Sequence, residues 1–177
     1  MRTRLDGLAA SVALGGAGLL ALGMACHAAG ARINTTRSIP VGLYWTSSAP
    51  VAKGAYVQFC PPPAAPFTQA KQRGYIGVGF CPGGYGLLMK RVLAAKGETV
   101  FITDEGVRVA GKLVPLSAPL AADRAGRPMP RYRASVTLAE SEVLLMSDVN
   151  AASFDARYFG PIRSAQIISV IRPVLTW

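Results

Sequence analysis

Apolar residues form one long run near the start of the chain, from Leu8 to Ala29, broken only by a serine, a cysteine and a histidine. As a helix this run would be roughly 33 Å long, enough to cross the hydrocarbon core of a bilayer. We therefore predict a cytoplasmic tail and transmembrane helix within residues 1–30. The rest of the chain, 31–177, is predicted to be a single domain.

Two arginines, Arg2 and Arg4, precede the apolar run. By the positive-inside tendency they keep the short tail in the cytoplasm and place everything after Ala29 on the other side of the membrane. A cleavable signal peptide is the alternative, because Ala29-Gly30-Ala31 is a small-x-small sequence. Both interpretations put the domain outside the cytoplasm.

Beyond residue 30 the apolar positions alternate with period two more often than 3.6, which is typical of strands. Short turn sequences containing glycine separate several of them, and this favours a mainly β fold with an antiparallel sheet. Residues 115–130, rich in Ala, Pro and Arg, are predicted to be a loop or insertion. The predicted strands are 55–59, 87–93, 99–102, 107–109, 112–114, 142–146 and 166–171.

The chain contains one histidine, His27, which lies at the end of the apolar run. A Ser-His-Asp or Cys-His nucleophile is therefore excluded from the domain. Zinc hydrolysis is disfavoured as well, because the three cysteines show no close-spaced ligand pair, and we predict no metal or cofactor. Hydrolytic chemistry would have to use Lys, Asp, Glu or Tyr.

The net charge is +10, from 19 Lys and Arg against 9 Asp and Glu. A nucleic-acid partner is still improbable, because the domain lies outside the cytoplasm. Four arginines of one segment, Arg124, Arg127, Arg131 and Arg133, are better matched to anionic lipid or an acidic partner.

Cys60 and Cys81 would lie in an oxidising compartment and could form a disulfide worth about 3 kcal/mol. The loop between them contains several prolines, so the bond would be structural rather than catalytic. Two separate buried thiols are the alternative.

Three stretches could carry chemistry. In the first, Ser38 lies between Asn34 and Tyr44, before Ile39-Pro40 and Gly42, which stiffen or redirect the backbone. This would present the Ser38 hydroxyl on a rigid segment. An inert serine in an ordinary turn is the simpler interpretation.

The second stretch is the predicted strand around Lys90 and Arg91, whose side chains must point to opposite faces. Burial can lower the pKa of a lysine by several units, and a neutral amine can accept a proton from a serine hydroxyl. An exposed lysine at a sheet edge is the alternative.

The third stretch places Ser153, Asp155 and Arg157 at alternate positions after an apolar strand. An extended chain would bring them to one face, where Asp155 and Arg157 could pair and Ser153 could bond to a neighbouring amine. The alternative is a loop shaped by an ion pair.

The order of these three stretches resembles the signal peptidase family of serine proteases, and most closely its TraF-type, conjugative-transfer branch. The similarity runs from Asn34-x-Thr36-x-Ser38-x-Pro40-x-Gly42-Leu43-Tyr44, through Met89-Lys90-Arg91-Val92 and Lys96-Gly97-Glu98-Thr99-Val100, to Ser153-x-Asp155-x-Arg157-Tyr158-x-Gly160-Pro161. The resemblance implies a barrel-like β domain on one transmembrane helix.

By this resemblance Ser38 is the nucleophile, Lys90 the general base, and Thr36 a hydroxyl that helps to form the oxyanion hole. Ser153 matches the hydroxyl that orients the lysine. Asp155 and Arg157 match a supporting pair, and the counterpart of Asp155 is also implicated in catalysis in the TraF-type branch. The stretch between Asp148 and Ser153 is shorter than in the family pattern.

The resemblance implies an endopeptidase that processes an exported pilin precursor for a conjugation apparatus, with possible ring closure of the product. Its partners would be that precursor, membrane lipid and the conjugation or secretion machinery. The rival functions are a general type I signal peptidase for many preproteins and a non-catalytic, membrane-tethered component of a secretion or mating assembly.

Overall fold

The computed structural model describes residues 2–177, which divide into two compact units, one that ends at Arg32 and one from Ile33 to Trp177. The first unit is dominated by helix α1 (Arg2–Ala28). Within it, Ala9–Ala28 is long and apolar enough to cross a membrane by length and composition. This agrees with the predicted transmembrane helix.

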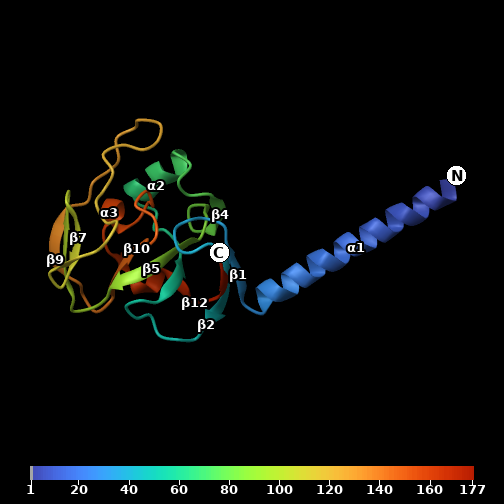
Figure 1. The fold of residues 1–177 in the computed structure, drawn as a ribbon, viewed down its shortest axis with the longest axis horizontal. Coiled ribbons are helices and arrows are strands. Elements are labelled where there is room, and N and C mark those ends of the chain that lie inside the picture. The colour runs from blue at the N-terminus through green and yellow to red at the C-terminus, as the bar shows by residue number, and fades with distance from the viewer. Residues whose placement is uncertain (1) are drawn as a thin grey trace. The chain divides into compact units, whose positions relative to one another are not determined.

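The second unit is built on a seven-stranded sheet (Figure 1). The C-terminal strand lies inside this sheet, hydrogen-bonded to strands from the first part of the unit. In spatial order the strands are β1 (Ala31–Asn34), β2 (Gly42–Ser47), β12 (Ile167–Thr176), β3 (Tyr56–Phe59), β5 (Leu88–Ala94), β10 (Glu142–Met146) and β11 (Ile162–Arg163). The pairs formed by β12 with β2 and β3, by β5 with β3 and β10, and by β10 with β11 are antiparallel.

A second, four-stranded sheet lies at the left of the unit in Figure 1, where β7 and β9 are labelled. Its strands are β8 (Lys112–Leu113), β7 (Gly106–Val109), β6 (Thr99–Thr103) and β9 (Ala134–Thr137). The mainly β, antiparallel fold expected from the sequence is confirmed.

Short elements complete the unit. Helix α2 (Ala65–Gln72) follows the proline-rich segment, and α3 (Ala156–Phe159) follows β10. Strand β4 (Val78–Cys81) forms bridges to Tyr85, and a 3-10 turn over Ser164–Gln166 precedes β12. The predicted disulfide between Cys60 and Cys81 is present, with their Cα atoms 5.5 Å apart.

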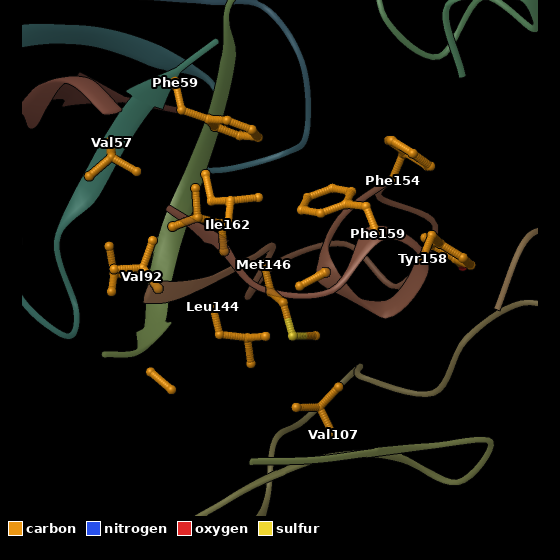
Figure 2. Close-up of a cluster of buried hydrophobic side chains, with 14 of the residues drawn as sticks. Val57, Phe59, Val92, Val107, Leu144, Met146, Phe154, Tyr158, Phe159 and Ile162 are labelled. Atoms are coloured by element: carbon orange, nitrogen blue, oxygen red, sulfur yellow. The ribbon is translucent and has the colours of Figure 1, made fainter. Parts of the chain in front are cut away.

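One apolar core joins both sheets and both short helices. Figure 2 shows Val107 of β7 in the same cluster as Leu144 and Met146 of β10, with aromatic rings of the α3 region beside them. Phe67 of α2 packs on Phe159 of α3 with ring centroids 4.7 Å apart. Strand β5, which carries Lys90, and the segment that carries Ser153 therefore both pack against this core.

All seven predicted strands are present within one or two residues at most ends, but β12 runs on from 171 to Thr176. Pro173 lies in that extension, which pairs only with β2, since the pairing with β3 ends at Ile171. A proline is tolerated there because no second neighbour needs its missing N–H. Five short strands, β1, β2, β4, β9 and β11, were not predicted, because two to six residues carry too little alternation.

Candidate active site

A cavity of about 590 Å³ brings together residues of all three candidate stretches. Ser38, Lys90 and Ser153 all lie on its wall, although they are far apart in the sequence. Apolar side chains line much of the remainder. The polar and charged residues on the wall also include Asn34, Thr36, Arg37, Tyr75, Asp123, Arg124 and Arg127.

The loop that carries Ser38 is held by Asn34, whose side chain is buried. Its Nδ2 lies within hydrogen-bond distance of the carbonyl oxygens of Thr36, Ile39 and Pro40, at 2.7, 3.0 and 3.0 Å. The buried Tyr44 also donates to the Pro40 carbonyl, and burial raises the pKa of this phenol to about 12. The loop is therefore rigid on both sides of Ser38.

Ser38 and Thr36 form a short hydroxyl chain. Their Oγ and Oγ1 atoms are 2.8 Å apart, and the Thr36 hydroxyl donates to Asn34 Oδ1 at 3.0 Å. With the Thr36 proton used in this way, the Ser38 hydroxyl donates to Thr36. Among the described residues no hydrogen bond joins Ser38 to Lys90, so the Ser38 side chain would have to turn about its Cα–Cβ bond for its hydroxyl to reach the amine.

Lys90 points into the protein from β5, as strand alternation allowed, and it is 2% exposed. Desolvation lowers the pKa of its amine to about 8, despite the nearby negative charge of Asp155, which acts in the opposite direction. Arg91 faces the other side of the strand and pairs with Asp148 at 2.5 Å. Of the two neighbouring cations, the one that can become neutral faces the cavity.

Ser153 sets the direction of the amine. Lys90 Nζ donates to Ser153 Oγ at 2.7 Å, and both groups are buried. In its neutral form the amine keeps a lone pair beside this bond, and that lone pair can accept a proton from the cavity.

Asp155 and Arg157 form a fully buried, two-pronged ion pair, with Nε–Oδ1 at 2.7 Å and Nη2–Oδ2 at 2.8 Å. The ion pair was predicted, but the prediction of an extended chain through all three residues is wrong. Asp155 is extended and caps α3, whereas Arg157 is helical. The Asp155 side chain accepts from the Arg157 backbone N–H at 3.3 Å, and this cap lets the guanidinium fold back onto the carboxylate.

Comparison with known proteins identifies the family. The family described as "Signal peptidase, peptidase S26" matches residues 9–177. This chain belongs to the signal peptidase family. Membership of this family supports a serine peptidase. The matched residues include the whole of the unit that contains the cavity.

Several relatives are similar over almost the whole chain. A "Plasmid transfer protein TraF" from Escherichia coli is 66% identical over 98% of this chain and 98% of its own length. A "Conjugal transfer protein TraF" from Agrobacterium tumefaciens (strain 15955) is 38% identical over 89% of each chain. A crystal structure of a signal peptidase I from Enterococcus faecalis V583 covers 71% of this chain and 100% of its own, with 16% identity and a TM-score of 0.40.

Arg157 also holds two loops together. Its Nη1 lies 3.1 Å from the carbonyl oxygen of Leu116 and 2.5 Å from that of Ala151, and its Nη2 donates to the carbonyl of Ser153 at 2.9 Å. The side chain thus fixes the segment that carries Ser153 against the start of the 115–130 loop. Its position is consistent with a supporting residue rather than one that touches substrate.

Two residues of the cavity wall, Asn34 and Tyr75, have structural roles that were not predicted from the sequence. Asn34 organises the Ser38 loop. The sequence feature that could have indicated this role is the position of Asn34 at the start of the motif that contains Ser38. Tyr75 donates to Asp123 and so holds the 115–130 loop against the cavity. Asp148 is not among the lining residues; one of its carboxylate oxygens is buried without a hydrogen-bond partner.

Among the described residues there is no group of three or more His, Cys, Asp and Glu side chains that could hold a metal ion. The polar side chains on the cavity wall are hydroxyls, two amides, one amine, three guanidinium groups and the carboxylate of Asp123.

Proposed function

We propose that this chain is a membrane-anchored serine endopeptidase in which Ser38 is the nucleophile and Lys90 is the general base. The observation that carries the proposal is the amine of Lys90, buried, of lowered pKa and bonded to Ser153, on the wall of the cavity that also holds Ser38. A lysine has to be neutral to act as a base, and this environment favours the neutral form.

In the proposed reaction Ser38 Oγ attacks the carbonyl carbon of the scissile peptide bond while Lys90 Nζ takes the hydroxyl proton. The negative charge that develops on the carbonyl oxygen is stabilised by backbone N–H groups near Ser38, with help from the Thr36 hydroxyl once its proton turns away from Asn34 Oδ1. The ammonium of Lys90 then gives its proton to the departing amine, which leaves an ester on Ser38. Water, or an amine of the substrate itself, breaks this ester.

The proposed substrate is an exported pilin precursor of a conjugative transfer system. The names of the relatives, plasmid and conjugal transfer proteins, support a role in conjugation over general preprotein processing. Residues 1–30 would be the anchor in the cytoplasmic membrane and 31–177 the periplasmic catalytic domain. The Cys60–Cys81 disulfide is consistent with an oxidising compartment.

The test uses the full chain in detergent with the purified precursor and follows the product by intact mass. We expect Ser38→Ala and Lys90→Ala to abolish processing, and the exposed controls Ser48→Ala and Lys112→Ala to retain it. A linear product differs from a cyclic one by the mass of one water. Processing that survives both substitutions would show that Ser38 and Lys90 are not the catalytic pair, and no processing by the wild-type chain would indicate a non-catalytic component. Cleavage of unrelated secretory preproteins at the same rate would favour a general signal peptidase.

A further inference from the structure

Four arginines lie in the segment between β8 and β9, and three of them are paired. Arg127 bonds to Asp123 at 2.6 Å, and both Arg131 and Arg133 bond to Asp104 at the end of β6. Arg124 has no hydrogen bond or ion pair among the described residues. Its charge is thus available to another molecule.

The backbone holds Arg124 in place. The segment folds into a tight turn in which the Asp123 N–H donates to the Arg127 carbonyl at 2.9 Å and the Gly126 N–H donates to the Asp123 carbonyl at 3.0 Å. The Asp123 carboxylate accepts from two further backbone N–H groups of the turn and from Tyr75. Arg124 stands at the tip of a rigid turn, on the wall of the cavity that holds Ser38.

A second unpaired guanidinium lies on the same wall. Arg37 directly precedes Ser38, lines the cavity, and has no hydrogen bond or ion pair within the described part of the chain. The acid on the described cavity wall is Asp123, which Arg127 already neutralises. With Lys90 in its neutral, reactive form, the cavity therefore carries two uncompensated positive charges beside the nucleophile.

We propose that Arg124, assisted by Arg37, binds a carboxylate of the substrate close to the scissile bond and so selects for acidic substrates. The inference rests on the proposed function, since it deepens the substrate class of the same site. A guanidinium presents paired N–H donors that match the two oxygens of a carboxylate. The carboxylate could belong to an Asp or Glu side chain or to the carboxyl terminus of the substrate.

The test measures equilibrium binding to the full chain in neutral detergent, with the Ser38→Ala substitution to prevent turnover. The probes are four fluorescent, alanine-rich nonapeptides, with Glu or Gln at the centre and a free or amidated carboxyl terminus. We expect a carboxylate to tighten binding about tenfold, close to 1.4 kcal/mol. Comparing the four peptides tells which carboxylate is recognised.

Adding Arg124→Gln should remove this preference, whereas Arg124→Lys should keep part of it, because the charge remains and the paired donors do not. Arg108→Gln is the matched control, an exposed arginine on β7 that does not line the cavity. It should retain the full preference. Higher salt should weaken the binding of the acidic peptides only.

Equal binding of the four peptides, or a preference that survives Arg124→Gln, would overturn the inference. So would a preference that disappears when phosphatidylglycerol vesicles, but not neutral phosphatidylcholine vesicles, are added, since Arg124 would then bind lipid in place of the substrate. In the otherwise wild-type chain, Arg124→Gln should raise KM for an acidic precursor with little change in kcat. Failure of the wild-type chain to cleave any precursor would refute the proposed function and leave the binding result standing.

Discussion

The burial of Lys90 predicts that its contribution to the stability of this chain increases as the pH rises into the alkaline range. The amine has an ordinary pKa of 10.5, and desolvation lowers it to about 8 in the folded chain. Below pH 8 both the folded and the unfolded chain hold the proton, so the cost of burying a cation is fully present. Between pH 8 and 10.5 the folded chain has released the proton and the unfolded chain still binds it, so the free energy of unfolding rises with pH.

The size of the effect follows from the pKa shift. Each pKa unit corresponds to about 1.4 kcal/mol, so the stability attributable to Lys90 should increase by about 3 kcal/mol across this window. Asp155 and Arg157 are the charged groups that act on the amine, and their effects oppose each other, which leaves desolvation as the main cause.

The assay is urea unfolding of the full chain in detergent, followed by the fluorescence of its two tryptophans, at several pH values from 7 to 10.5. Lys90→Met keeps a long, flexible side chain but cannot titrate. The difference in stability between wild type and Lys90→Met cancels the titration of other groups, and it should move by about 3 kcal/mol in favour of wild type as the pH rises. Lys112→Met, at an exposed position on β8, should show no such trend. A constant difference between wild type and Lys90→Met would refute the reasoning.

Four further results are expected. The value of kcat/KM should rise with pH through about 8 and then level off, with activity at pH 7 about a tenth of the plateau; a profile flat from pH 6 to 9 would contradict Lys90 as the base. Arg157→Lys should cost about 3 kcal/mol in urea unfolding, because an ammonium cannot grip Asp155 with two bonds and also hold the loop carbonyls, and a loss below about 1 kcal/mol would be inconsistent with this. Asn34→Ala should lower kcat more than it changes KM, because the backbone carbonyls around Ser38 lose their donor; an unchanged kcat would show that the loop holds its shape without Asn34. Replacing Cys60 and Cys81 together with alanine should cost about 3 kcal/mol and leave kcat unchanged, since neither residue lines the cavity, and a fall in kcat in the still-folded variant would argue against a purely structural bond.

Much of the site could be predicted because its chemistry depends on local order along the chain. Alternation in one strand was enough to place Lys90 and Arg91 on opposite faces, and the single histidine, His27, left Lys, Asp, Glu or Tyr for hydrolytic chemistry in the domain. The pairing of Asp155 with Arg157 also followed from their spacing, although the conformation that joins them did not. A capped single turn of helix brings them together, and nothing in a four-residue segment distinguishes that turn from an extended chain.

By itself the amino-acid sequence determined the apolar N-terminal helix, the β-rich domain and the identity of the groups that could react, because these depend on composition and on periods of two or 3.6 residues. Only the tertiary structure decided that Ser38 rests against Thr36 rather than Lys90, that Asn34 shapes its loop, and that Arg124 on the 115–130 loop faces the same cavity. None of these contacts could be predicted from an apolar repeat of two or 3.6 residues. They arise from how the strands and loops pack, which decides what each polar side chain meets when water is excluded.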